Sequence, residues 1–226
     1  MADFTIYIGN KNYSSWSLRP WLALKHAGAA FEEVMIPLDQ PDSAMNLRRR
    51  SPSGRVPVLQ HGALAIWESL AICEYLAEQF PAARLWPEDR ESRAQARAVS
   101  NEMHAGFAEL RNSLPMDISR RWPLGNRLAK AGADVERVTA IWRECRVRFG
   151  SRGANGAGDF LFGGFTIADA MFAPATTRFV TYAVPLDPVC SAYIAAMQRW
   201  PAMQEWVAGA KAEPWVISYN VNAGAA

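Results

Sequence analysis

Short apolar runs and helical patterns alternate over the first 80 residues of the chain. Four runs of strand type are predicted at 4–8, 31–37, 56–60 and 63–67. Helical segments are expected at 17–28, 43–50 and 69–80. His61 and Gly62 lie between the last two strands, which is typical of a hairpin turn. The order strand, helix, strand, helix, hairpin, helix predicts a thioredoxin-like α/β domain.

Beyond residue 90 the pattern is almost wholly helical. Apolar residues recur at steps of three and four in two stripes: Val99, Met103, Phe107, Leu110 and Leu114, then Val135, Val138, Trp142, Cys145 and Phe149. We expect Asp134 to cap the second helix, Gly150 to end it, and a Gly-rich loop at 151–158 to follow. Three more helices are predicted at 166–179, 188–197 and 201–212. The predicted division is a thioredoxin-like domain at 1–80, a linker at 81–90 and an all-helical domain at 91–226.

Composition excludes several classes of function. Half of the 226 residues are hydrophobic, and the net charge of +2 favours neither nucleic acid nor an anionic membrane surface. No apolar run approaches the ~20 residues of a membrane helix, and the start lacks the pattern of a signal peptide. The three cysteines and three histidines lack metal-site spacing, so we expect buried reduced thiols and no metal. The expectation is a soluble cytoplasmic protein.

The turn after the first strand carries the first candidate chemistry. With Ser17 as N-cap, Pro20 falls at the third helical position, where no intrahelical bond is lost. Ser14 and Ser15 then precede a helix N-terminus, which stabilises an anion such as a thiolate. No cysteine lies within fifty residues of the pair, which disfavours disulfide exchange by the protein itself. The serines are therefore candidates to donate a hydrogen bond to a ligand's sulfur, or else are only cap and turn residues.

One serine is enough for this task. An ordinary thiol has a pKa of about 8.5, and lowering it by two units requires about 2.7 kcal/mol of preference for the thiolate. A hydrogen bond to a charged group contributes roughly 1.5–3 kcal/mol. A helix N-terminus adds about 0.3–1 kcal/mol.

Two further motifs locate the rest of a ligand. Val56 precedes Pro57 just before a strand, where a thioredoxin-like domain has a cis proline and exposes the preceding backbone to an extended peptide. The alternative is an ordinary trans proline that starts a strand. Glu68 and Ser69 stand at the last junction of strand and helix. Ser69 is a natural N-cap, its helix end can hold a carboxylate, and Glu68 can hold an ammonium group. Sulfur at one end and an amino-acid head at the other describe glutathione.

Four segments carry a resemblance to a known family: SSWSLRPWLAL, SPSGRVPVL, WESLAICEYL and GGFTIADAMFAP. With them the chain resembles the cytosolic glutathione transferases over nearly its whole length. The resemblance implies that Val56 pairs with the cysteinyl unit of glutathione, that Pro57 is cis, and that Glu68 and Ser69 hold the γ-glutamyl head. It also implies a homodimer. Thr166 and Asp169 match the family's helix-capping box, a structural role that the residues support by themselves.

The serine turn is similar to that of the serine-using classes, and zeta is the nearest. Trp16 stands where zeta enzymes carry a cysteine, and Glu68 stands where they carry glutamine. Alignment with zeta points to Ser14 as the sulfur contact, and alignment with theta- and delta-type enzymes points to Ser15.

We therefore expect a transferase that activates glutathione, as co-substrate, for attack on a small apolar electrophile. The alternatives are a glutathione-dependent isomerase of the maleylacetoacetate type and a non-catalytic glutathione-binding or regulatory module. The expected catalytic residues are Ser14 and Ser15, and the expected glutathione contacts are Trp16, Arg55, Val56, Pro57, Glu68 and Ser69. Met103, Phe107 and Trp215 are candidates to line the electrophile pocket, and the second substrate is not identified by the sequence.

Overall fold

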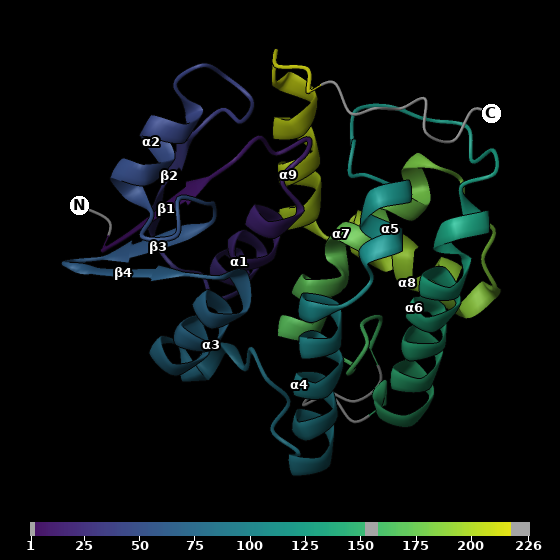
Figure 1. The fold of residues 1–226 in the computed structure, drawn as a ribbon. Coiled ribbons are helices and arrows are strands. Elements are labelled where there is room, and N and C mark those ends of the chain that lie inside the picture. Colours follow the sequence, from purple (N-terminus) through teal and green to yellow (C-terminus); the bar gives the residue numbers. More distant parts are fainter. Residues whose placement is uncertain (1–2, 152–157, 218–226) are drawn as a thin grey trace.

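The computed structural model describes residues 3–151 and 158–217. Its first part is a four-stranded sheet in the order β2-β1-β3-β4 (Figure 1). The strands are β1 (Phe4–Ile8), β2 (Phe31–Met35), β3 (Val58–His61) and β4 (Leu64–Trp67). β1 runs parallel to β2 and antiparallel to β3, and β3 runs antiparallel to β4. This sheet confirms the predicted thioredoxin-like architecture.

Three helices accompany the sheet: α1 (Ser15–His26), α2 (Ser43–Arg50) and α3 (Ser69–Gln79). Burial alternates along β1, where Phe4, Ile6 and Ile8 are inside, as a strand with one face on a core requires. α1 packs against α3, and both contribute fully buried side chains, Leu22 and Leu76 among them, to the core.

Helix α1 begins two residues earlier than expected, and this corrects three predictions. Ser14, not Ser17, is the N-cap, because the Ser14 hydroxyl oxygen accepts from the backbone N–H of Ser17 at 3.4 Å. Pro20 therefore lies inside the helix rather than in its first turn. Since proline has no N–H, the carbonyl of Trp16 lacks its helical partner, so one intrahelical bond is lost where the prediction expected none.

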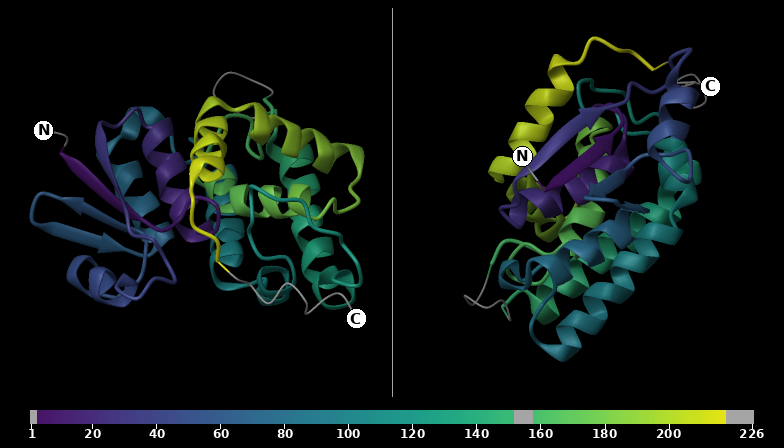
Figure 2. Two further views of the ribbon diagram at one scale, coloured as in Figure 1. Left: turned by 90° about the horizontal axis from the view of Figure 1, so that it is seen from above. Right: turned by 90° about the vertical axis from the view of Figure 1, so that its left-hand side faces the viewer.

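The second part of the chain is helical, and Figure 2 shows it beside the sheet-bearing part. After a short 3-10 turn, η1 (Pro81–Ala83), come α4 (Arg90–Ala105), α5 (Ala108–Ser113), α6 (Leu128–Phe149), α7 (Ile167–Thr181), α8 (Pro188–Arg199) and α9 (Pro201–Ala212). α7 is buried along almost its whole length and packs against α1 and α4. No helix in the described ranges combines the length and apolar character that crossing a bilayer requires.

Two predictions for the helical part are wrong. The apolar stripe 99–114 is not one helix, because the chain breaks at Gly106 and at Phe107, whose φ is +63°. Asp134 does not cap α6, which begins at Leu128. The Asp134 carboxylate instead accepts from the backbone N–H of Leu110 at 2.9 Å, in the first turn of α5. Gly150 ends α6 as expected, and residues 152–157 of the predicted Gly-rich loop lie outside the described residues.

The predicted capping box is confirmed at the start of α7. One oxygen of the fully buried Asp169 carboxylate accepts from the N–H and the hydroxyl of Thr166, at 2.8 and 3.0 Å. The other accepts from the N–H of Leu161 and the hydroxyl of Tyr193. Burial raises the pKa of Asp169 to about 6, and the hydrogen bonds oppose that rise. The carboxylate thus joins α7, α8 and the segment before α7.

We expect Asp169→Ala to lower the free energy of unfolding by about 3 kcal/mol or more, because it leaves buried N–H groups without acceptors. Asp187→Ala is the matched control, since Asp187 caps α8 from a more exposed position and its loss should cost about 1 kcal/mol. Denaturant unfolding measures both. Equal losses would show that Asp169 is only a helix cap.

Candidate functional site

The two serines before α1 differ in how their hydroxyls are held. The Ser14 hydroxyl lies 2.7 Å from that of Ser17, which also accepts from the N–H of Gly9 at 3.1 Å. Ser15 is the first residue of α1, and within the described part of the chain its hydroxyl has no hydrogen-bond partner. Both side chains are almost completely buried, at 6% exposure each. The Ser14 hydroxyl is therefore oriented by its neighbours, and that of Ser15 is free to rotate.

The peptide bond between Val56 and Pro57 is cis, as predicted. Pro57 lies directly before β3, which begins at Val58. Val56 lines the same cavity as Ser14 and Ser15. The backbone before the proline is therefore close to the serine turn, as the thioredoxin-like layout requires.

The junction of β4 and α3 differs in one respect from the prediction. Glu68, with φ at +69°, occupies the cap position, and Ser69 is the first residue of α3 rather than its N-cap. No side chain caps this helix, so its first N–H groups are not satisfied by a cap. Ser69 is buried, its hydroxyl accepts from Arg19 at 3.5 Å, and the Glu68 side chain is 53% exposed.

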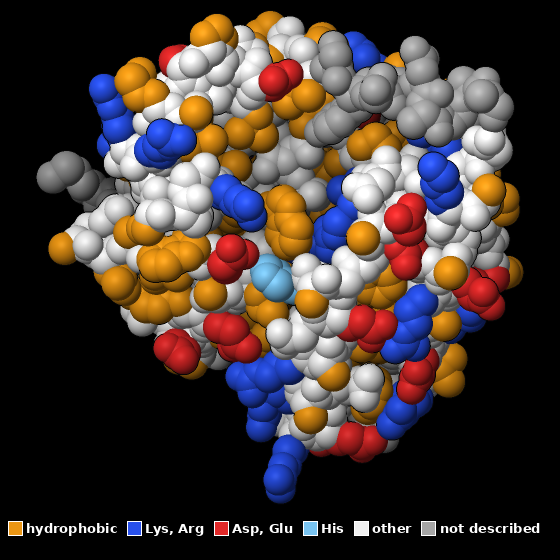
Figure 3. Space-filling model, viewed as in Figure 1, with side chains coloured by type: hydrophobic (Ala, Val, Ile, Leu, Met, Phe, Trp, Pro, Cys, Tyr) orange, Lys and Arg blue, Asp and Glu red, His pale blue; other side chains and the backbone are white. Residues whose placement is uncertain are grey.

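Two adjoining cavities bring all eight predicted residues together. The larger has a volume of about 380 Å³ and its lining includes Ser14 and Ser15. The smaller, of about 160 Å³, is lined by Ser53, Pro57, Glu68 and Ser69 among others. The residues that line both are Trp16, Arg55 and Val56. Figure 3 shows the hollow on this face of the molecule, with hydrophobic side chains in its floor and Lys or Arg side chains at its edges.

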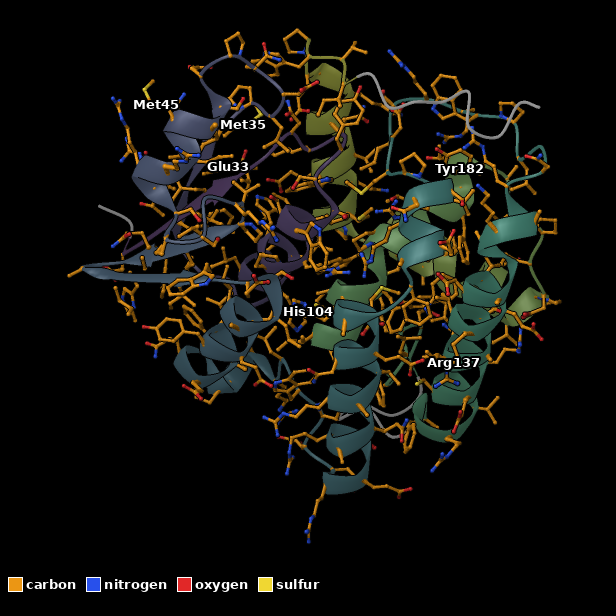
Figure 4. The ribbon with its side chains drawn as sticks, viewed as in Figure 1. Glu33, Met35, Met45, His104, Arg137 and Tyr182 are labelled. Atoms are coloured by element: carbon orange, nitrogen blue, oxygen red, sulfur yellow. The ribbon has the colours of Figure 1, made fainter. Side chains whose placement is uncertain are left out.

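Trp16 lines both cavities and contacts two cations. The guanidinium of Arg19 lies 4.3 Å from the ring centroid, and that of Arg111 lies 4.7 Å from it. The ring of His104 meets Trp16 edge-on at 5.4 Å, and its Nε2 is 3.6 Å from the Glu68 carboxylate. Figure 4 shows His104 near one end of α4, facing the sheet-bearing part. Cation–π contacts of this kind fix the position of the indole ring.

Arg19 brings a buried positive charge close to the serine turn. Its side chain is fully buried, and its Nε and Nη2 atoms have no hydrogen-bond partner in the described protein. Burial lowers the pKa of Arg19, and the nearby charges of Arg111 and Arg178 add to the effect. A guanidinium nevertheless remains protonated in proteins, so the site carries a positive potential that favours an anion.

The larger cavity is only partly apolar. Leu38, Leu47, Pro115 and Met116 supply apolar surface, and Arg111 and Arg178 also line it. Arg111 donates to the carbonyl oxygens of Met103 and Gly106, and Arg178 donates to that of Leu114. The candidates Met103 and Phe107 are buried elsewhere in the core, and Trp215 is not among the residues that line the cavity.

Sequence reasoning missed the three arginines because they converge only in the folded chain. Arg19 lies within the quoted motif after the serines, but its burial against Trp16 depends on the packing of α1. Arg111 gives no local signal. Arg178 stands in an otherwise apolar helix, and a charge in such a helix is a signal that points to a functional or paired position.

The cysteines contribute no nucleophile. Cys73, Cys145 and Cys190 are all buried and unpaired, as predicted, and burial raises the pKa of each thiol to about 12. The described residues contain no cluster of His, Cys, Asp or Glu that could hold a metal ion. The groups that the site offers to a bound molecule include hydroxyls, cations, the Glu68 carboxylate and the uncapped N-terminus of α3.

We expect Arg19→Met to leave the thermal unfolding midpoint unchanged or to raise it, because methionine fills a similar volume without a buried, incompletely paired charge. Arg19→Ala should lower the midpoint, because it leaves a cavity under Trp16. Circular dichroism measures both. If the methionine variant loses as much stability as the alanine variant, the charge itself stabilises the fold through the ring.

Two family models match this chain. The model for the glutathione S-transferase N-terminal domain matches residues 13–79, and the model for the glutathione S-transferase C-terminal domain matches residues 93–209. The first match spans the serine turn, the cis proline and all of α3. The second extends from α4 into α9.

Individual relatives agree with these matches. A probable maleylacetoacetate isomerase of Caenorhabditis elegans is 33% identical over 129 residues, which cover 56% of this chain and 59% of that protein. A maleylacetoacetate isomerase of Rattus norvegicus is 34% identical over 110 residues, which cover 47% of this chain and 50% of that protein. The chain thus spans only about half the length of the curated relatives it matches.

A solved structure covers more of the chain. A glutathione transferase homolog from a Burkholderia strain, with bound glutathione, has a TM-score of 0.67 to this protein at 27% identity. The similarity covers 93% of this chain and 99% of that one. The arrangement of sheet and helices described above is therefore shared over almost the full length of both.

Proposed function

The chain belongs to the glutathione S-transferase family, and from that premise we propose that it binds glutathione and activates its thiol for attack on an electrophile. The observation that carries the proposal is the convergence of three features on adjoining cavities. These are the serine turn at the N-terminus of α1, the backbone before the cis proline, and the uncapped N-terminus of α3 beside Glu68.

The two cavities suggest how glutathione lies. Its γ-glutamyl head occupies the smaller cavity, where free N–H groups of α3 and the Ser69 hydroxyl take the carboxylate and Glu68 takes the ammonium group. Its cysteinyl backbone pairs with Val56 in the manner of an added strand. The sulfur then lies past Trp16, in the larger cavity with the serines. Arg55, which lines both cavities, is placed to contact the peptide between them.

The chemical step uses the thiolate. The thiol loses its proton to solvent, and the sulfur's charge is stabilised by a serine hydroxyl, the N-terminus of α1 and the buried cation Arg19. The thiolate then attacks the electrophilic carbon of a second substrate in the larger cavity, and the leaving group departs from that carbon. Catalysis consists of thiol activation and of holding the two reactants together.

Ser14 is the better candidate for the sulfur contact. Ser17 accepts from the N–H of Gly9, so its own proton can be donated to the Ser14 oxygen at 2.7 Å. The Ser14 hydroxyl can then donate its own proton in a hydrogen bond to an acceptor in the cavity. A donor oriented in advance stabilises a developing charge without reorganisation, which a freely rotating hydroxyl does not provide. Ser15 lies beside it as a second, unconstrained donor.

We expect Ser14→Ala to reduce kcat/KM for conjugation of glutathione to a chloronitroarene about tenfold to a hundredfold. The lost hydrogen bond to a charged sulfur contributes roughly 1.5–3 kcal/mol, or about one to two units of thiol pKa. Ser15→Ala is the matched control and should cost less. Thermal unfolding monitors the lost helix cap in the Ser14 variant.

Three other outcomes would change the assignment. A larger loss in Ser15→Ala would make Ser15 the sulfur contact. Full activity in the double variant would remove the serines from the mechanism. A folded protein that neither binds immobilised glutathione nor conjugates it would support the alternative of a non-catalytic regulatory module.

A second candidate, glutathione-dependent isomerisation of a carboxylate-bearing substrate, is favoured by one observation. Arg111 and Arg178 line the larger cavity, so two positive charges lie where the second substrate would bind. A guanidinium pairs well with a substrate carboxylate. The names of the two relatives, both maleylacetoacetate isomerases, agree with such a substrate.

The homodimer stays a prediction from the family resemblance.

We expect Arg178→Met and Arg111→Met to lower kcat/KM for a carboxylate-bearing electrophile at least about tenfold more than for a neutral one, because only the former loses an ion pair. The ratio within one variant cancels any general damage to the fold. Arg137→Met is the matched control, since Arg137 lies on α6 in a surface ion pair with Glu102 (Figure 4). Equal losses for both electrophiles would favour an uncharged second substrate.

A further inference from the structure

Glu213, just beyond the end of α9, contacts the loop that leads to the serines. Its carboxylate oxygens accept from the backbone N–H groups of Lys11 at 2.6 Å and Asn12 at 3.2 Å. The side chain is partly buried, and burial raises the pKa of Glu213 while the two N–H groups oppose that rise. A carboxylate from the last described segment is thus bound to the first loop of the chain.

Other contacts to the same two residues also come from the helical part. The carbonyl of Lys11 accepts from the indole N–H of Trp206 on α9 at 2.9 Å. The side-chain amide of Asn12 donates to Asp117 at 2.9 Å, and its oxygen accepts from the N–H of Ser119 at 2.8 Å. The conformation of this loop is therefore determined by α9 and by the segment after α5.

The loop transmits its position directly to the serines. The carbonyl of Asn10 accepts from the N–H groups of Tyr13 and Ser14, at 3.1 and 2.8 Å, and so closes a turn around Lys11 and Asn12. The N–H of Ser15 is bonded to the carbonyl of Tyr13 at 3.1 Å. A shift of Lys11 and Asn12 must move this turn, and with it the hydroxyl of Ser14.

We propose that Glu213 is a positioning residue for thiol activation: it holds the turn of residues 10–13 so that the Ser14 hydroxyl meets the sulfur. The proposal rests on the proposed function in that it takes glutathione as the ligand. Glu213 touches neither the sulfur nor the second substrate in this arrangement. It acts through two hydrogen bonds to backbone N–H groups. Through them the C-terminal segment helps to position the proposed thiol site of the N-terminal half.

The direction in which the pKa of the bound thiol changes distinguishes a positioning role of Glu213 from an effect of its charge. A negative carboxylate near the site disfavours a thiolate, so removing its charge alone should lower the pKa of the bound thiol. Releasing the turn should instead raise the pKa of the bound thiol, because the Ser14 hydroxyl is then no longer oriented to donate a hydrogen bond to the thiolate. Glu213→Gln removes the charge and replaces one acceptor oxygen by an N–H₂ group that faces an N–H donor.

The experiment follows the thiolate absorbance of enzyme-bound glutathione against pH. We expect Glu213→Gln to raise the pKa of the bound thiol by about one unit, which lowers kcat/KM at neutral pH about tenfold. Glu205→Gln is the matched control, because Glu205 lies on α9 in a surface ion pair with Lys25 and should leave the thiol unchanged. Glu213→Asp retains the charge and should recover part of the effect. An unchanged or lowered thiol pKa in Glu213→Gln overturns the proposal.

Amide hydrogen exchange tests the positioning without glutathione. In the ligand-free protein, Glu213→Gln should speed exchange at Lys11, Asn12 and Ser14 at least about tenfold relative to Glu205→Gln. Equal exchange in the two variants overturns the proposal even if the thiol pKa moves. If wild type shows no bound thiolate, the proposed function fails, and faster exchange would still establish that Glu213 orders the turn.

Discussion

Helix α1 is buried between the two parts of the molecule, because it packs against α3 on one side and against α7 and α9 on the other. Its side chains from Ser15 to Leu24 are almost all inside. A helix enclosed in this way presents only its N-terminus to the cavities. The partial positive charge of that end is therefore directed at whatever binds there. The serine turn, the Trp16 ring and the Arg19 charge all follow from the placement of this one helix.

The burial of Arg19 has an energetic consequence for the site. A buried guanidinium with two unpartnered nitrogens destabilises the protein by its lost hydration, and stacking on Trp16 compensates only in part. An anion in the neighbouring cavity recovers some of that loss through the Coulomb interaction, which is strong where water is excluded. Under the proposed function, the same charge that destabilises the fold favours a thiolate over a thiol. On that proposal, stability and thiol activation are opposed at this residue.

Sequence patterns predicted the parts of the structure that depend on short stretches of chain. The strand Phe4–Ile8 and the capping box at Thr166 were identified in full, since period-two burial and a box of four residues are local signals. The cis bond before Pro57 was expected from its place before a strand and from the family. All eight predicted site residues line the two cavities. Each was predictable because it belongs to a short motif at the end of a strand or helix.

The errors have physical causes that lie outside such stretches. Asp134 was recognised as a cap, but it caps α5 rather than its own helix, because packing of α5 against α6 determines which N–H groups it meets. The start of α1 was misplaced because Pro20 was assumed to avoid the interior of a helix. Capping by Ser14 and burial of the flanking apolar residues outweigh the bond lost at the Trp16 carbonyl. Glu213 and Lys11 are 202 positions apart, so no local pattern could reveal that the last segment holds the first loop. The proposed ligand contacts belong to short motifs that the sequence reveals. Contacts between distant parts of the chain hold these motifs in place, so their relative positions depend on the whole fold.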